Sequence, residues 1–178
     1  MAYLIDVNGY RLIDANGYLL RVADDFALIT DRTKADVELV SALAAKGWNM
    51  TEEELLRWLS GMKGAYNYTD LNRVEKAVQY VSNRFKQAGF DIVLDTKTDW
   101  TYTDFPELAQ MERYLENVRR LRQALPMAAN VPQVPANMNK LTYEDANNIE
   151  KILLVIDDVI TNISLAWYYS GDLFAGEV

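Results

Sequence analysis

The 178-residue sequence contains no cysteine and no histidine. Their absence excludes disulfides, thiolate nucleophiles, imidazole bases, the Ser-His-Asp triad and zinc sites made from Cys or His. What remains for chemistry is carboxylate, lysine and tyrosine groups, or a hard-cation site built from oxygen atoms. We therefore predict a protein that is not an enzyme, with no catalytic residues, no cofactor and no metal site.

The chain also lacks a long apolar run and a recognisable leader. Residues 1–6 have no basic segment followed by an apolar core, so we expect no signal peptide. The apolar stretch over residues 151–163 is interrupted by Asp157 and Asp158, so no membrane span is expected either. A formal net charge of −8 argues against nucleic acid or an anionic membrane as the main partner. These features predict a soluble protein made in the cytoplasm.

A doubled motif stands at the start of the chain. Asn8-Gly9-Tyr10 recurs as Asn16-Gly17-Tyr18, and apolar residues flank both copies. Because Asn-Gly supplies the positive φ values of a type I′ turn, residues 1–30 are predicted to form a β-hairpin or ribbon arm. An isolated hairpin is marginal in water, so the arm needs a surface on its own domain or on another chain. For docking on another chain, Tyr10 and Tyr18 are the predicted contact residues.

Residues 31–178 are predicted to form a mainly α domain, a bundle of about five helices. Capping residues and apolar spacing predict helices at residues 34–46, 51–60, 69–88, 106–125 and 142–167. Residues 90–97 fit a short strand or an extended connector, and the prolines within residues 126–140 predict a crossover. The last helix is apolar around much of its circumference, which suits either a central helix or a seam between subunits.

The clusters of charged residues fit structural roles better than functional sites. Asp157 and Asp158 are adjacent in a predicted helix and point about 100° apart, so they do not share an ion easily. Residues 52–54 are glutamates in the first turn of a helix, where acidic side chains favour the macrodipole. In the fourth predicted helix, Glu112 and Glu116 are expected to pair with Arg119 or Arg120, or with Arg113 nearby. Such pairs predict a salt-bridged face that is solvated or lies between chains.

Aromatic residues gather at the junctions between the predicted elements, among them Trp100, Tyr102, Trp167 and Tyr168. Trp and Tyr offer rigid amphipathic area, so exposed ones form protein interfaces or stack on sugars. Packing inside the protein is the commonest role for such residues, an interface is the next and glycan contact is the rarest. For the interface role, Trp100, Trp167 and Tyr168 are the predicted partner-binding residues.

Four stretches of the chain form a recognisable set: GAYNYTDLNRVE at residues 64–75, KTDW at 97–100, DANNIEK at 145–151 and WYYSGDLFAGE at 167–177. They resemble structural proteins encoded by tailed bacteriophages and prophages of Firmicutes. The resemblance spans about residues 28–178. It implies a virion component made in the host cytoplasm, associated with the tail, baseplate or fibre anchor, and it implies no catalysis. No functional residue carries over from that family.

Three functions stay open at the level of sequence. The first is a non-enzymatic virion structural protein that forms homo-oligomers and docks on other virion proteins, with the arm as its docking element. The second is a module that binds host-surface glycan, stacking sugar on Trp100, Tyr102, Trp167 or Tyr168. The third is a cell-wall hydrolase with two carboxylates about 5 to 9.5 Å apart, for which the sequence nominates no pair.

Overall fold

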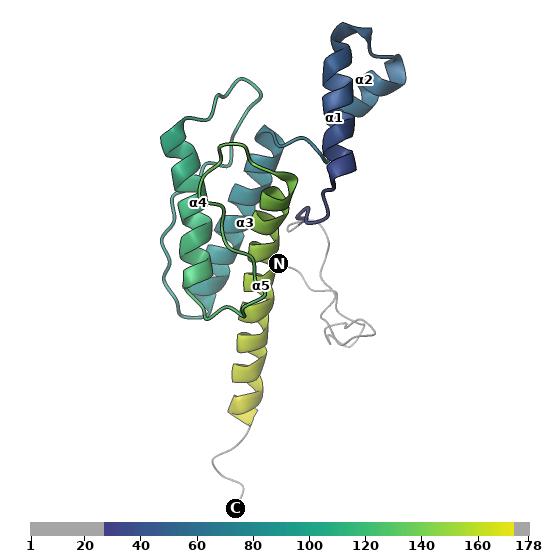
Figure 1. Ribbon diagram of the computed structural model, residues 1–178. Coiled ribbons are helices and arrows are strands. Elements are labelled where there is room, and N and C mark those ends of the chain that lie inside the picture. Colours follow the sequence, from purple (N-terminus) through teal and green to yellow (C-terminus); the bar gives the residue numbers. More distant parts are fainter. Residues whose placement is uncertain (1–26, 173–178) are drawn as a thin grey trace, which may run out of the picture.

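The computed structural model of the protein describes residues 27–172, which are mainly helical (Figure 1). The described residues form five α-helices, one 3₁₀ turn and no strand: α1 (Lys34–Lys46), η1 (Gly47–Asn49), α2 (Glu52–Leu59), α3 (Tyr68–Gln87), α4 (Leu108–Gln123) and α5 (Tyr143–Asp172). The mainly α prediction is therefore confirmed. The predicted β-ribbon arm, with Tyr10 and Tyr18, lies outside the described residues.

The helices begin where local capping chemistry satisfies their first backbone N–H groups. At α2 the Thr51 hydroxyl accepts from the Glu54 N–H, and the Glu54 carboxylate accepts from the Thr51 N–H at 3.0 Å. The start of α3 differs from the expected one, because Asn67 is the cap and its N–H donates to Asp70 at 2.9 Å. Gly47 ends α1 with a φ of 53°, a left-handed value that suits glycine. The sequence thus places the helix boundaries to within a few residues.

Three of the five helices form the bundle, and all three run in the same direction. α3, α4 and α5 pack against one another, with their N-termini at one end of the molecule (Figure 1). Ion pairs agree with this arrangement. Near the start of both helices, Arg73 of α3 pairs with Glu150 of α5; further along both, Arg84 pairs with Asp157. Parallel neighbours need long returns, which are residues 88–107 and 124–142.

α5 is the central helix of the bundle. Over its first half, Ile149, Ile152, Leu153 and Ile156 are all fully buried. They pack against a stripe on α3 that includes Phe85, so each removes a large apolar side chain from water, worth roughly 1.5–3 kcal/mol. The broad apolar coverage of this half therefore reflects packing on several sides. With 30 residues α5 is about 45 Å long, and its C-terminal part projects beyond the bundle (Figure 1).

Arginines of α4 hold the two crossovers against the bundle. Arg113 donates to the backbone carbonyl of Asp95 in the first crossover and, at 2.6 Å, to the buried carboxylate of Glu75 in α3. Arg122 donates to the carbonyl of Pro132 in the second crossover at 2.8 Å. Of the partners considered for Glu112 and Glu116, Arg113 is therefore not one, because it pairs with a buried carboxylate on α3 instead. Residues 90–97 are an extended connector.

The hairpin of α1 and α2 stands away from the bundle (Figure 1). Gly64 lies where the hairpin meets the bundle. A Cβ at this position would be 2.2 Å from the backbone oxygen of Asp36. Such an approach leaves room only for glycine. Lys63, next to it, pairs with Asp31 at 2.7 Å. The turn before α3 is therefore pressed directly against the first turn of α1, and this contact helps to set where the hairpin points.

Candidate functional site

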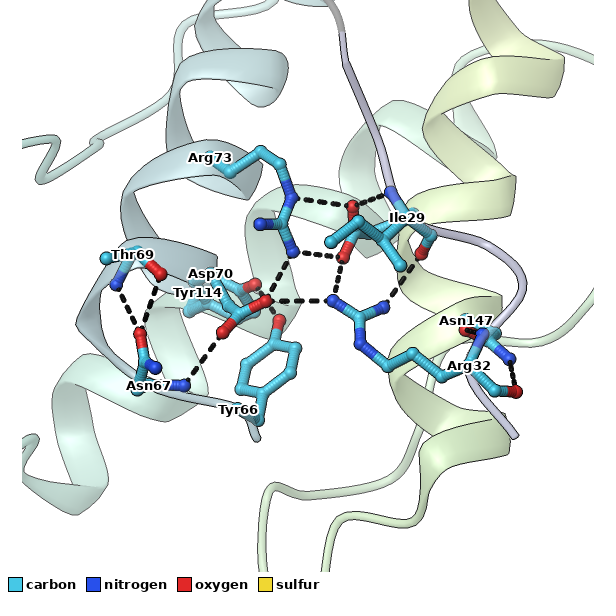
Figure 2. Close-up of polar contacts among 10 residues, drawn as sticks. Ile29, Arg32, Tyr66, Asn67, Thr69, Asp70, Arg73, Tyr114 and Asn147 are labelled. Carbon is cyan, nitrogen blue, oxygen red and sulfur yellow. Dashed lines mark hydrogen bonds and ion pairs between the residues drawn. The ribbon is translucent and has the colours of Figure 1, made fainter. Parts of the chain in front are cut away.

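A buried ion network ties the segment before α1 to the bundle (Figure 2). We call residues 28–33 the strap. The fully buried carboxylate of Glu150 on α5 accepts from the backbone N–H of Ile29 at 2.6 Å and from Arg32 at 2.7 Å, both in the strap. Arg73 of α3 donates to both oxygens of the same carboxylate, at 3.0 and 2.8 Å. Glu150 thus joins three separate segments of the chain, which are the strap, α3 and its own helix α5.

Arg32 is the centre of the strap, and its side chain is 2% exposed. Besides Glu150, its guanidinium donates to Asp70 at 2.9 Å and to the backbone carbonyl of Ile29 at 2.7 Å. Its own backbone is fixed as well, because Asn147 accepts from the Arg32 N–H at 3.0 Å and donates to the Arg32 carbonyl at 2.9 Å. Figure 2 shows this reciprocal pair beside the ion network.

The network is electrically balanced. Its two guanidiniums, Arg32 and Arg73, face two carboxylates, Asp70 and Glu150. Burial alone would lower the pKa of Arg73, but its hydrogen bonds and attraction to Glu150 and then Asp70 raise that pKa above its ordinary value. Every carboxylate charge in the cluster is therefore matched by a guanidinium. The network anchors the strap and, through it, the hairpin.

Two tyrosines close the network on the side of α4. The hydroxyl groups of Tyr66 and Tyr114 are hydrogen-bonded at 2.5 Å, and the Arg32 guanidinium lies 5.5 Å from the centre of the Tyr66 ring. Burial raises the pKa of both Tyr66 and Tyr114 far above the ordinary tyrosine value. Both hydroxyls are therefore neutral at physiological pH and serve as hydrogen-bonding groups rather than as bases.

A pocket of about 820 Å³ opens at the end of the bundle where the three helices begin. Its walls come from the start of α3, the start of α4, the residues before α4 and the residues before α5. The most buried lining side chains are Leu71, Trp100 and Leu115. Exposed apolar side chains surround the opening: Tyr102 is 84% exposed and Leu108 is 65% exposed. A volume of this size falls within the usual range for ligand sites. The lining combines apolar side chains with polar ones such as Asp104, Glu112 and Arg119.

A second apolar surface lies on the hairpin. We call the exposed side chains Trp48, Leu55, Leu56, Trp58 and Leu59 the hairpin surface. Trp48 is fully exposed and Leu56 is 63% exposed. α2 has no buried residue, and a helix of this length is not stable alone. Single exposed apolar residues are ordinary, but four of them on one short helix, with Trp48 in the turn before it, are typical of a contact surface.

The predicted partner-binding residues lie in different places. Trp100 is 3% exposed and belongs to the core, so its ring presents no open face to solvent, although it lines the pocket. The side chains of Trp167 and Tyr168 lie outside the described residues, as do Tyr10 and Tyr18. Tyr102, predicted only as a possible sugar-stacking ring, is at the rim of the pocket. The structure thus brings Trp100 and Tyr102 together and leaves the partner roles as predictions.

The acidic clusters have the structural roles expected of them. Asp157 is fully buried and pairs with Arg84 at 2.7 Å, whereas Asp158 is exposed, so the two carboxylates do not face a common site. Glu116 pairs with Arg119 at 2.6 Å, as predicted for this helix. Within residues 27–172, no group of three or more acidic side chains is arranged to hold a metal ion. None of the described helices is long and apolar enough to cross a membrane.

Sequence reasoning did not identify the strap network, the pocket or the hairpin surface as sites. For the network a signal exists: Glu150 and Asp157 are seven residues apart, on the apolar face of the last helix, where charge is expensive unless it is paired. Comparisons of the chain with protein-family models, with curated proteins and with solved structures give no match.

Proposed function

We propose that this protein is a non-enzymatic structural component of a tailed-phage virion, at the tail, baseplate or fibre anchor, and that it works by oligomerising and docking on neighbouring virion proteins. The observation that carries the assembly part is the hairpin surface, which presents Trp48, Leu55, Leu56 and Leu59 to solvent on an element that stands apart from the bundle. The virion part is supported by the sequence resemblance described above.

The strap explains how such a surface is held in a defined position. The hairpin follows the strap directly, and the strap is fixed to α3 and α5 through Arg32, Asp70 and Glu150. Contact surfaces bind more tightly when they are held rigidly before binding, because less conformational entropy is lost. A buried ion network at the base of an otherwise lightly packed hairpin therefore favours a role in assembly over a role in chemistry.

The geometry favours assembly over glycan binding. Sugar recognition needs an open aromatic face with hydrogen-bonding groups around it, and Tyr102 is such a ring at the rim of the pocket. However, Trp100 is buried, and aliphatic side chains such as Leu71 and Leu115 form the deepest lining of the pocket. Polar side chains such as Asp104, Asn137 and Asn139 also line the pocket and suit sugar hydroxyls, so glycan binding is the second candidate. The aliphatic side chains suit the apolar anchors of a protein partner better.

The test is to determine whether the chain is part of the particle. Particles are induced from a strain that carries this sequence, purified by density gradient and analysed by quantitative mass spectrometry. We expect peptides from residues 27–172 in the particle fraction at a fixed ratio to the major tail protein. Recovery of the chain only from the particle-free supernatant would contradict a structural role.

A further inference from the structure

We propose that the pocket at the start of the bundle binds an extended, basic peptide segment of a neighbouring virion protein, with one large apolar side chain of that segment as its anchor. The inference rests on the proposed assembly function and specifies one of its contacts. Four features of the described residues carry it: an apolar floor, an apolar rim, an unpaired carboxylate and an unpaired buried N–H group, all in or around the same pocket.

Helix α4 presents one continuous face to the pocket. The residues of α4 that line it are Leu108, Met111, Glu112, Leu115 and Arg119. Residues three, four, seven and eleven positions after Leu108 lie on the same side of a helix as Leu108 itself. Glu112 is therefore on the same face as the apolar lining, between the exposed Leu108 and the buried Leu115, and a ligand that reaches the floor also lies against Glu112.

Exposed apolar side chains continue the floor outward and form the rim. Tyr102, Phe105 and Leu108 are 84%, 89% and 65% exposed, and Phe105 lies between two residues that line the pocket. In protein recognition, a large apolar side chain inserted into a pocket carries much of the affinity when apolar neighbours exclude water around it. The rim and floor together thus suit a partner with an apolar anchor.

The charges in the wall indicate the sign of the partner. Asp104 pairs with Lys97 at 3.5 Å, and Arg119 pairs with Glu116 at 2.6 Å. Glu112, in contrast, has no ion pair or hydrogen bond among the described residues. The whole chain carries a formal charge of −8, so its field attracts a basic segment and repels a second copy of itself. A lysine or arginine of the partner is therefore the expected counterpart of Glu112.

Hydrogen-bonding groups in the wall suit the backbone of an extended peptide. Trp100 is 3% exposed, and its indole N–H has no hydrogen-bonding partner among the described residues, which is unusual for a buried donor. Its backbone is held by Asn72, which accepts from the Trp100 N–H and donates to the Trp100 carbonyl, both at 2.8 Å. The exposed amide of Asn139 also lines the pocket. Backbone carbonyl and N–H groups of a bound segment can pair with such groups.

The first experiment identifies the occupant. Overlapping synthetic peptides that cover the other proteins of the purified particle, together with peptides from this chain, are arrayed and probed with the full-length chain. A glycan array is probed in parallel. We expect binding to peptides of another virion protein that carry a lysine or arginine close to a large apolar residue. Binding confined to glycans, or to peptides of this chain, would overturn the proposal.

The second experiment measures the affinity of the strongest such peptide by fluorescence polarisation. Leu108→Gln removes an apolar side chain at the rim and is expected to weaken binding about 10-fold. Val93→Gln is the matched control, because Val93 is 72% exposed and does not line the pocket, and it should bind as the wild type does. Circular dichroism checks that both variants keep their helical content. Equal affinity of Leu108→Gln and Val93→Gln would contradict docking at the rim.

A charge exchange tests the pairing with Glu112. Glu112→Lys is expected to weaken binding about 5-fold, whereas Asp91→Lys, at an exposed acidic position outside the pocket, should have a smaller effect. A peptide whose basic residue is changed to glutamate should bind Glu112→Lys to within about threefold of the original pair, as expected for a direct contact. Failure of this exchange to restore binding would contradict the assigned pair.

The indole N–H signals of the chain locate the peptide directly by NMR. The signal of Trp100, assigned by its loss in Trp100→Phe, is expected to shift when the peptide is added, while those of Trp48 and Trp58 stay in place. A shift of Trp48 and Trp58 alone would place the peptide on the hairpin surface and overturn the proposal. An array without any bound peptide would also overturn it, but the chain would still be found in purified particles. Absence of the chain from the particles would instead count against the proposed function itself.

Discussion

The guanidinium of Arg32 donates a 2.7 Å hydrogen bond to the carboxylate of Glu150, which is 118 residues away in the sequence. Both side chains are almost fully buried. This contact places the strap across α5, and the strap in turn positions the hairpin that carries the exposed apolar surface. The position of the hairpin surface therefore depends on the Arg32–Glu150 pair, and the contribution of this pair to the free energy of unfolding can be measured.

Replacing Arg32 with alanine is expected to lower the free energy of unfolding by about 3 kcal/mol or more. The loss follows because removing one partner leaves a buried carboxylate with a missing donor, which costs more than the pair itself contributes. Urea unfolding followed by circular dichroism measures the change. Arg120→Ala is the control, because Arg120 is exposed, and it should change the free energy by no more than about 0.5 kcal/mol. A loss under 1 kcal/mol for Arg32→Ala would show that the strap is not anchored by this network.

Glu75 predicts a pH dependence of a defined sign. Burial is the largest influence on this carboxyl and raises its pKa above the ordinary 4.5, even though Arg113 opposes the shift. At pH values just above 4.5, the Glu75 carboxyl therefore binds more protons in the folded chain than in the unfolded chain. Its contribution to stability is fully present below that value and is lost as pH rises through the folded pKa.

The comparison that isolates this contribution is between the wild type and Glu75→Gln, by urea unfolding from pH 4 to 7. As pH rises, the free energy of unfolding of the wild type is expected to fall relative to that of the variant and then to level off. Carboxylates elsewhere titrate in both proteins and cancel in the difference. A difference that is flat with pH, or that grows as pH rises, would contradict the burial argument.

Gly64→Ala is expected to disturb the junction between the hairpin and the bundle. A Cβ there would meet the backbone of Asp36 at 2.2 Å, so the chain must move to accept it. Gly61→Ala is a suitable comparison, because Gly61 has a φ of 88° but open space around it, so only the backbone strain of about 1–2 kcal/mol applies. Hydrogen exchange should show α1 losing protection in Gly64→Ala while α3 and α5 keep theirs. Equal protection of α1 in both variants would contradict the close contact.

Association of copies is expected to strengthen when ionic strength rises from about 0.05 to 0.3 M. Each chain carries a formal charge of −8, so copies repel one another, and salt screens that repulsion. The hairpin surface that is proposed to make contacts is apolar, so salt has little attraction between opposite charges to weaken there. Sedimentation equilibrium at several salt concentrations measures the trend. Association that weakens steadily with salt would indicate a contact dominated by ion pairs.

Local features of the fold could be predicted from the sequence, because they depend on residues close together in the chain. The capping pair of Thr51 and Glu54 and the left-handed turn at Gly47 are of this kind. The pairing of Arg113 with Glu75 could not be predicted, because Glu75 comes from another helix and no local pattern identifies it. The parallel course of the three bundle helices is equally non-local.

The candidate site was harder to predict for a related reason. The spacing of Leu55, Leu56 and Leu59 is typical of any amphipathic helix, whether its apolar face packs on the core of its own chain or is exposed. The pattern alone therefore does not show that these side chains are exposed. Trp100 and Tyr102 are two residues apart in one loop, yet the first is buried and the second is exposed. Which ring turns inward is decided by packing against the bundle, and sequence spacing does not carry that information.

The most direct test of assembly is the molar mass of the purified full-length chain, measured by multi-angle light scattering over a series of concentrations. For the wild type, the account predicts a weight-average mass that exceeds 20.4 kDa and rises with concentration. The mass of Leu56→Asp is expected to be closer to that of a single chain. A wild-type mass of 20.4 kDa at every concentration would contradict it.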